Sequence, residues 1–206
     1  MPETVRDFRR AQIVAAARRL VAEQGLDALT FGALEERLAF TRGVVTYHFA
    51  SKDDLVRAVF ASAIDEIDAA VLAQVEASAS IEDKLCAILR ANVRGFIERA
   101  EAGRVLLSFW GRLSSDPEVR RINAELYARY RRHTAKLVRK AREAGDVGPV
   151  DANALATVMV GIVLGIATQH YFDPGRIDVD AAVEEACAAV VARVSRARGQ
   201  RRRASG

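Results

Sequence analysis

The chain has 206 residues, of which half are apolar and 28% are charged, with only 4 Pro and 2 Cys. This is the balance of an ordinary soluble globular protein, built as one sizeable domain or as a small domain joined to a larger one. Its two distant cysteines exclude a disulfide framework and a CxxC metal pair, and we interpret Cys86 and Cys187 as small buried hydrophobes. Helix formers dominate and no segment alternates as a strand does, so an all-α fold is expected.

The formal net charge of +4 is unevenly distributed along the chain. Residues 1–52 carry 8 basic and 6 acidic groups, residues 53–192 carry 17 and 21, and residues 193–206 carry 6 Arg and no acid. A weakly basic head on an acidic body suits a protein with an anionic partner at one end. The N-terminus lacks an apolar signal segment, and the most apolar stretch, residues 154–167, is too short to span a bilayer. We therefore expect a cytoplasmic protein with no membrane partner.

The first helix is predicted over residues 6–24, and Gly25 ends it because that position favours a left-handed backbone. Three hydroxyl side chains then stand where N-caps are needed, at Thr30, Thr41 and Ser51. They predict two short helices followed by a longer one. Such a run of elements is typical of a small compact head.

The rest of the chain is predicted to form longer helices. They are expected at about 80–99, 103–114, 117–144, 151–171 and 178–197. The chain then divides into a head over residues 1–51, a helical body over residues 52–198 and an Arg-rich tail over residues 199–206. We expect the tail to be disordered.

The most informative segment is residues 30–52, TFGALEERLAFTRGVVTYHFASK. Its two short capped helices are separated by a tight turn, and their apolar residues can meet in one small core. This arrangement holds the second helix on the surface, where it can enter a major groove of DNA. Gly43 lets the backbone approach DNA closely, and Lys52 lies in the first turn of the next helix, where it makes a phosphate-binding spot with backbone N–H groups.

Here the chain resembles the TetR family of transcriptional regulators. The residues that carry the resemblance are Leu34 to Thr41, Gly43 to Phe49 and Ser51 to Leu55. A looser likeness to the BetI-like branch of that family comes from FWGRLSSDPEVRRIN, residues 109–123. The resemblance implies a three-helix helix-turn-helix DNA-binding domain, followed by a larger helical domain for ligand binding and dimerisation. It also implies a homodimer on a pseudo-palindromic DNA operator, controlled by a small-molecule effector.

Two residues depart from the pattern of the family. Ala39 stands where the turn usually has Gly, and an Ala in the left-handed region costs about 1 kcal/mol. Thr46 stands where a phosphate-contacting Tyr is commonest, and its shorter hydroxyl reaches less far. Both affect details of the DNA contact.

The resemblance implies that Arg42, Gly43 and Val44 face base edges, together with Tyr47. Tyr47, His48 and Lys52 are expected to hold phosphates. The alternatives are a surface role for His48, a packing role for Tyr47 and a merely solvated Lys52. The full set of expected DNA-binding residues is Thr30, Thr41, Arg42, Gly43, Val44, Thr46, Tyr47, His48 and Lys52.

In the body, aromatic and polar side chains on inward-facing stripes are candidates for a ligand pocket, although core packing is the simpler interpretation of each. They are Phe96, Phe109, Trp110, Tyr127, Tyr130, His133 and Met159. Small residues spaced four apart on an apolar helix predict a tight helix contact, here a four-helix dimer interface rather than burial within one subunit. The candidates for the interface are Val158, Gly161, Ile162, Gly165, Val183 and Val190.

Three histidines and two cysteines offer no catalytic triad, no metal-ligand spacing and no phosphate loop. We therefore expect no enzyme, no cofactor and no metal. The preferred interpretation is a ligand-responsive repressor that a small-molecule inducer releases from its operator. The alternative is a helical small-molecule-binding or adaptor protein with a weakened DNA-binding head, an idea that Ala39 and Thr46 support.

Overall fold

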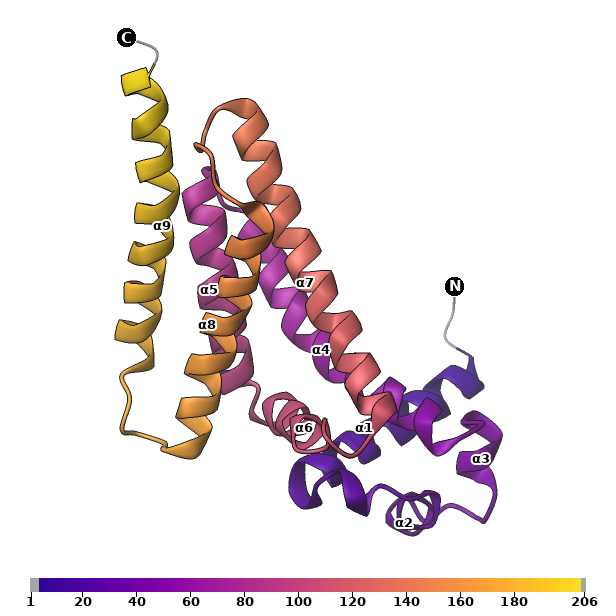
Figure 1. The fold of residues 1–206 in the computed structure, drawn as a ribbon. Coiled ribbons are helices and arrows are strands. Elements are labelled where there is room, and N and C mark those ends of the chain that lie inside the picture. Colours follow the sequence, from indigo (N-terminus) through magenta and orange to yellow (C-terminus); the bar gives the residue numbers. More distant parts are fainter. Residues whose placement is uncertain (1–3, 205–206) are drawn as a thin grey trace. The chain divides into compact units, whose positions relative to one another are not determined.

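The computed structural model describes the backbone of residues 4–204 and the side chains of residues 4–69 and 71–195. Over this range the chain is helical, and no strand occurs in it (Figure 1). The elements are α1 (Val5–Gln24), the 3-10 turn η1 (Leu26–Ala28), α2 (Phe31–Arg37), α3 (Val44–His48), α4 (Lys52–Glu76), α5 (Ile81–Glu98), α6 (Ala100–Trp110), α7 (Pro117–Ala144), α8 (Ala152–Phe172) and α9 (Val179–Ala204). The predicted all-α fold is confirmed.

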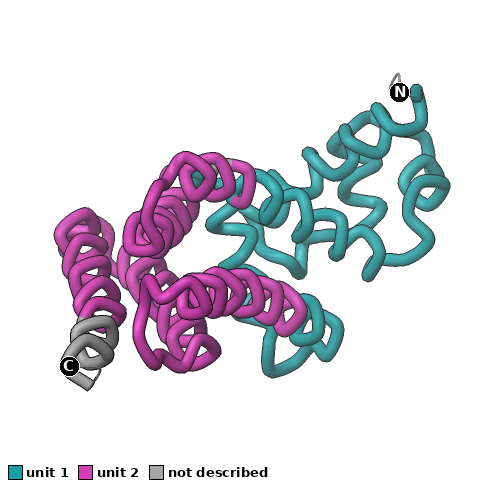
Figure 2. The backbone as a smooth tube through the Cα atoms, turned by 90° about the horizontal axis from the view of Figure 1, so that it is seen from above, with its two compact units in different colours: residues 1–67, 99–122 teal, residues 68–98, 123–206 magenta. Residues whose placement is uncertain are grey.

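The helices form two compact units, shown in different colours in Figure 2. Unit 1 consists of residues 1–67 and 99–122, and unit 2 of residues 68–98 and 123–206. Unit 1 thus contains the predicted head, and also α6 and the first turns of α4 and α7. Because α4 and α7 each run through a unit boundary, two continuous helices connect the units.

The core of unit 1 is built around α1, which packs on α2, α3, η1 and α6. Phe109 of α6 is fully buried there, with its ring centroid 4.7 Å from that of Phe60 on α4. An aromatic pair at this distance adds to the free energy of burial. The helix-turn-helix therefore rests on a core that includes a helix from much later in the sequence.

Within unit 2, α5 packs against both α8 and α9, and α8 also contacts α9 (Figure 1). Cys86 and Cys187 are both buried at the α5–α9 contact, where the Cys187 Sγ lies 3.9 Å from the carbonyl oxygen of Cys86. Burial raises the pKa of the Cys187 thiol to about 12, so it is a neutral thiol at physiological pH. The interpretation of both cysteines as small buried residues is confirmed.

Two helices are longer than predicted. The helix α9 ends at Ala204 rather than near residue 197, so it includes most of the segment 199–206 that was predicted to be a disordered tail; residues 205–206 lie outside the described residues.

The helix α8 has 21 residues, which by length and composition is enough to cross a membrane, with mean hydropathy 1.6. The prediction that this apolar stretch is too short was wrong, because the helix starts at Ala152 and continues through residues 168–172. Only a third of its most apolar part is buried within the chain.

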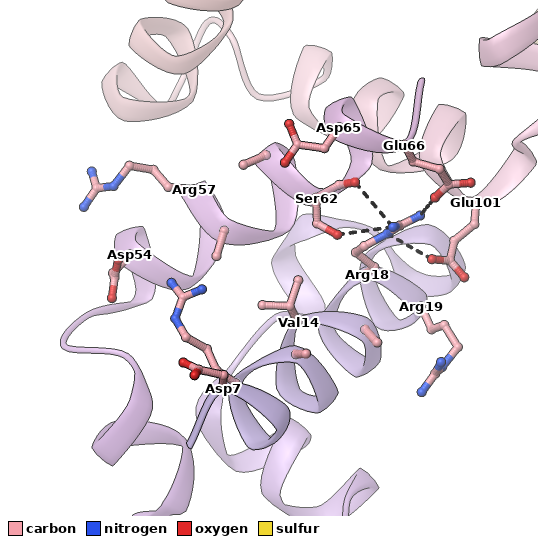
Figure 3. Close-up of a pocket in the computed structure, with 15 residues that line it drawn as sticks. Asp7, Val14, Arg18, Arg19, Asp54, Arg57, Ser62, Asp65, Glu66 and Glu101 are labelled. Carbon is pink, nitrogen blue, oxygen red and sulfur yellow. Dashed lines mark hydrogen bonds and ion pairs between the residues drawn. The ribbon is translucent and has the colours of Figure 1, made fainter. Parts of the chain in front are cut away.

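A charged cluster joins α1, α4 and α6 in unit 1. The Arg18 guanidinium lies 2.6 Å from the Glu66 carboxylate and 3.1 Å from that of Glu101, and it donates to the Ser62 hydroxyl at 3.3 Å. Figure 3 shows Arg18 directed into this cluster, whereas its neighbour Arg19 is directed away from it. The Arg18 side chain is only 13% exposed, so these bonds are partly shielded from water.

The cluster lies at one end of a groove between α1 and α4, with a volume of about 930 Å³. The groove is lined by small apolar residues and by charges of both signs, so it favours neither anions nor cations. Its acidic residues are Asp7, Asp54, Asp65, Glu66 and Glu101, and its basic residues are Arg10, Arg18, Arg19 and Arg57.

We predict that Arg18→Ala lowers the free energy of unfolding by about 1 kcal/mol, because it removes the cation beside Glu101 and the nearer of the two cations beside Glu66, the other being Arg99 at 3.7 Å. The measurement is the denaturant midpoint in urea. Arg19→Ala is the matched control, and its effect is expected within about 0.5 kcal/mol. Equal midpoints for the two variants would contradict the role given to the cluster.

Candidate nucleic-acid interface

The helix α2 is held firmly on α1. The Thr30 hydroxyl accepts the Ala33 N–H at 3.1 Å, which confirms Thr30 as its N-cap. The Arg37 guanidinium donates to both carboxylate oxygens of Glu23 on α1, at 3.0 and 2.8 Å. Because Leu34 between them is fully buried, α2 is a fixed base for the turn that follows.

The turn after α2 is left-handed at Ala39, with φ +52°, as the sequence predicted. The Ala39 N–H donates to the Glu36 carbonyl at 3.1 Å and the Phe40 N–H to the Glu35 carbonyl at 2.8 Å. This pair of bonds is a Schellman motif, which usually has Gly where Ala39 stands. The hydrogen bonds offset the cost of about 1 kcal/mol that the Ala side chain adds.

The predicted N-cap of α3 was wrong. Thr41 precedes α3 by a further turn, with its carbonyl accepting the Val44 N–H at 3.3 Å, and the N-cap is Gly43, at φ +89°. A left-handed N-cap with no side chain cannot bond the free N–H groups at the start of the helix. The carboxylate of Glu35 on α2 does so instead, accepting the Gly43 N–H at 2.8 Å and the Val45 N–H at 3.3 Å. Glu35 was not among the residues predicted from the sequence.

One face of α3 is anchored and the other is open. Val45 and the following Phe49 are fully buried, whereas Tyr47 is 71% exposed. Thr41 and Arg42 are also exposed, and within the described part of the chain their side chains have no partner. The exposed residues of this short segment are therefore accessible to a large ligand such as a DNA duplex.

The remaining predicted contact residues differ in whether their polar groups are available to bond a DNA phosphate. The Thr46 hydroxyl donates its only proton to the Gly43 carbonyl at 2.9 Å, so it has no proton to offer a phosphate in this arrangement. His48 is half-buried, and its Nδ1 is enclosed without a hydrogen bond among the described residues, which leaves Nε2 for any phosphate contact. Lys52 is exposed in the first turn of α4, which the Ser51 hydroxyl caps by accepting the Asp54 N–H at 3.1 Å.

Three arginines of α1 extend this surface, and the sequence analysis did not single them out. Their guanidinium carbons lie over aromatic rings of the turn and of α3: Arg6 over Tyr47 at 5.8 Å, Arg9 over Phe40 at 5.2 Å and Arg10 over Phe49 at 4.7 Å. These are cation–π distances. The stacking holds exposed positive charge beside α3. In the sequence, only the excess of basic over acidic residues in 1–52 indicated such a charge.

The predicted pocket residues fall into both units. Phe109 and Trp110 belong to unit 1, where Phe109 is core, and the other five belong to unit 2. The Tyr130 hydroxyl donates to the Asp68 carboxylate at 2.7 Å, and its burial, together with that carboxylate, raises the pKa of Tyr130 well above its usual value. His133 is exposed, so its expected place on the inward stripe of α7 was wrong.

The predicted interface residues also separate into two groups. Val183 and Val190 of α9 are only 4% and 3% exposed, so they pack inside the chain and cannot themselves face a partner, which corrects the prediction. The alanine-rich sequence of α9 has no clear apolar stripe, and the wrong face was chosen for that reason. On α8, Val158 is 56% exposed and Gly161 is also exposed, while Ile162 and Gly165 are half-buried.

Family models match two parts of the chain. Residues 13–59 match the bacterial regulatory proteins of the tetR family, and residues 81–196 match the C-terminal domain of BetI-type transcriptional repressors. The HTH-type transcriptional regulator BetI of Burkholderia thailandensis is 26% identical over 181 residues, which are 87% of this chain and 90% of the relative.

Solved structures share the fold. A transcriptional regulator from Saccharomonospora viridis in complex with choline aligns with a TM-score of 0.71 at 21% identity, over 85% of this chain and 92% of that one. AibR in complex with isovaleryl coenzyme A and operator DNA aligns with a TM-score of 0.66 at 22% identity, over 87% and 96%.

The exposed helix α3 on its fixed base and the matches over both parts of the chain lead to one conclusion. The chain belongs to the TetR family and is a DNA-binding transcriptional regulator, not an enzyme, with a BetI-type C-terminal domain.

Proposed function

We propose that the protein is a homodimeric repressor that binds a pseudo-palindromic operator and leaves it when a small molecule binds to unit 2. The observation that carries the proposal is the open face of α3 and of the turn before it: Tyr47 on the helix and Arg42 in the turn are exposed, and Gly43 between them adds no side chain. Such a repressor acts on the chromosome, and we therefore place it in the cytoplasm of a bacterium.

On this proposal α3 enters the major groove. Arg42 donates to the edge of a guanine base and Val44 contacts the methyl group of a thymine. Both contacts distinguish one base from another. Tyr47, His48 and Lys52 hold the phosphate backbone, and Arg6, stacked on Tyr47, adds a further positive charge on the side of α1. Thr30 and Thr41 contribute hydroxyls near the ends of the short helices.

We further propose that the open face of α8 forms the dimer interface, together with the outward face of α9. In the first half of α8, the exposed Ala154, Val158 and Gly161 recur every three or four positions and are small or apolar, as a helix contact requires. Burying such a face in a partner stabilises the dimer through the hydrophobic effect. A dimer with two heads then meets two half-sites of DNA.

The effector is proposed to bind in unit 2, among Phe96, Tyr127, Tyr130 and Met159. A ligand that binds one spacing of the two heads better than the other shifts the population toward it, by no more than its difference in affinity for the two states. The helices α4 and α7 transmit the change, because each is continuous from unit 2 into unit 1.

The first test is selection of bound duplexes from a random DNA library at a stated salt concentration. We expect an enriched pseudo-palindrome whose half-sites lie about 10 base pairs apart, or a multiple of that. Lys52→Ala is expected to weaken binding to all duplexes and to lower the slope of log K against log salt by about one. Lys136→Ala, which removes the same charge from an exposed site on α7, is the control. A folded protein that enriches no sequence would refute the proposal.

The dimer interface is tested with Gly161→Arg. A side chain at Gly161 meets no atom within 4 Å in the single chain, and replacing a helical glycine raises helix propensity, so the fold of the monomer should tolerate it. We expect the molar mass in light scattering to fall from dimer to monomer. Lys140→Glu, an exposed charge change on α7, should leave the dimer intact. A dimeric Gly161→Arg variant would mean that another face pairs the subunits.

Choline, the ligand of the similar Saccharomonospora viridis structure, is the first probe for the effector. We expect millimolar choline to weaken binding to the selected duplex, because the unit 2 candidates include aromatic rings, and the Asp68 carboxylate is bonded to one of them, Tyr130; both kinds of group are suited to a quaternary ammonium. The measurement is a fluorescence anisotropy titration with sodium chloride at equal ionic strength as the control. Unchanged affinity would exclude choline and leave the DNA-reading role intact.

A further inference from the structure

The helix α3 does not provide its own N-cap. It has only five residues, from Val44 to His48, and its N-cap Gly43 has no side chain. The first N–H groups of any helix lack partners within the helix, and in so short a helix they are most of the N–H groups present. Something outside α3 must satisfy them if the helix is to keep one orientation.

Glu35 of α2 satisfies them and also closes the preceding turn. Its Oε1 accepts the Gly43 N–H at 2.8 Å and the Val45 N–H at 3.3 Å, while its backbone carbonyl accepts the Phe40 N–H at 2.8 Å. Glu35 is half-buried, so these bonds are partly shielded from water. One residue of the fixed helix α2 therefore bonds the turn at its beginning and the recognition helix at its start.

We propose that Glu35 is a positioning residue for sequence-specific DNA binding: its carboxylate sets the orientation in which α3 is presented to the major groove. The inference rests on the proposed DNA-reading role of α3. Base readout depends on orientation, whereas attraction to phosphates depends mainly on charge.

The bond has a second consequence for the DNA contact. Free N–H groups at a helix start attract anions, but here a carboxylate already occupies those of Gly43 and Val45. A DNA phosphate cannot use them, and the negative charge of Glu35 repels it. The proposal therefore predicts that Glu35 favours specific binding at the expense of non-specific binding.

Glu36 is a matched control for this role. It lies next to Glu35 on the same helix and carries the same charge, but it is exposed, and its side chain has no partner among the residues that the structure describes. The experiment compares Glu35→Ala, Glu35→Gln and Glu36→Ala in the full-length protein. Each is titrated by fluorescence anisotropy with the duplex selected from the random library and with a scrambled duplex of equal length.

We expect Glu35→Ala to lower the affinity for the selected duplex about tenfold, since it removes two charge-assisted hydrogen bonds, and to leave the affinity for the scrambled duplex unchanged or higher. Glu35→Gln keeps an oxygen that can accept both N–H groups, so it should retain specific affinity within about threefold. Glu36→Ala should behave like the unaltered protein. The proposal is overturned if Glu35→Ala keeps specific affinity, or if Glu35→Gln or Glu36→Ala loses as much as it does.

Amide hydrogen exchange of the free protein separates this inference from the proposed function. The Gly43 and Val45 amides should exchange faster in Glu35→Ala than in Glu36→Ala, with or without any known operator. If the library yields no operator, the proposed function fails. The exchange rates of the Gly43 and Val45 amides in the free protein still show whether Glu35 caps α3. If Glu35→Ala unfolds, Glu35→Asp replaces it, because its carboxylate is one methylene shorter and reaches the two N–H groups less well. Faster exchange at both amides in Glu35→Asp than in Glu35→Gln supports the proposal, and equal rates overturn it.

Discussion

A helix of five residues does not hold its shape alone, and the DNA-reading role that we propose for this protein depends on one such helix. Forming the first turn of a helix costs more conformational entropy than its hydrogen bonds return, so short helices exist only where tertiary contacts hold them. For α3 these contacts are the buried Val45 and Phe49 on one side and the Glu35 carboxylate at its start. The remaining side is then free to face DNA.

The same constraint explains the construction of unit 1. Since α3 takes its orientation from α2, α2 must itself be fixed, and the buried Leu34 and the Arg37–Glu23 ion pair hold it on α1. The helix α1 is fixed in turn by α6 and by the Arg18 cluster. Support for α3 thus reaches α4 and α6 within one compact unit.

Local patterns predicted most of the fold, because they reflect local physics. The caps Thr30 and Ser51 follow from short sequence motifs, and the structure has both; the left-handed turn at Ala39 follows from the family resemblance, and the structure has it too. Contacts between distant residues had no such signal. Glu35 reads as an ordinary helix former, and nothing in the sequence places its carboxylate at Gly43.

Faces of helices were the second weakness. In α9 the many alanines make every face similar in hydrophobicity, so Val183 and Val190 were assigned to the outside although they pack against unit 2. Phe109 has the apolar character of a pocket residue, but it is core of unit 1, because α6 returns to the head after α5. His133 lies on α7 beside the stripe rather than in it.

The most direct test of the account is hydrogen exchange of the full-length protein with and without the selected duplex. The account predicts slower exchange on DNA binding in residues 41–52 and at the start of α1, near Arg6, because these segments carry the proposed contacts. Protection confined to α5, α8 and α9, or none in residues 41–52, would contradict the claim that α3 reads the DNA.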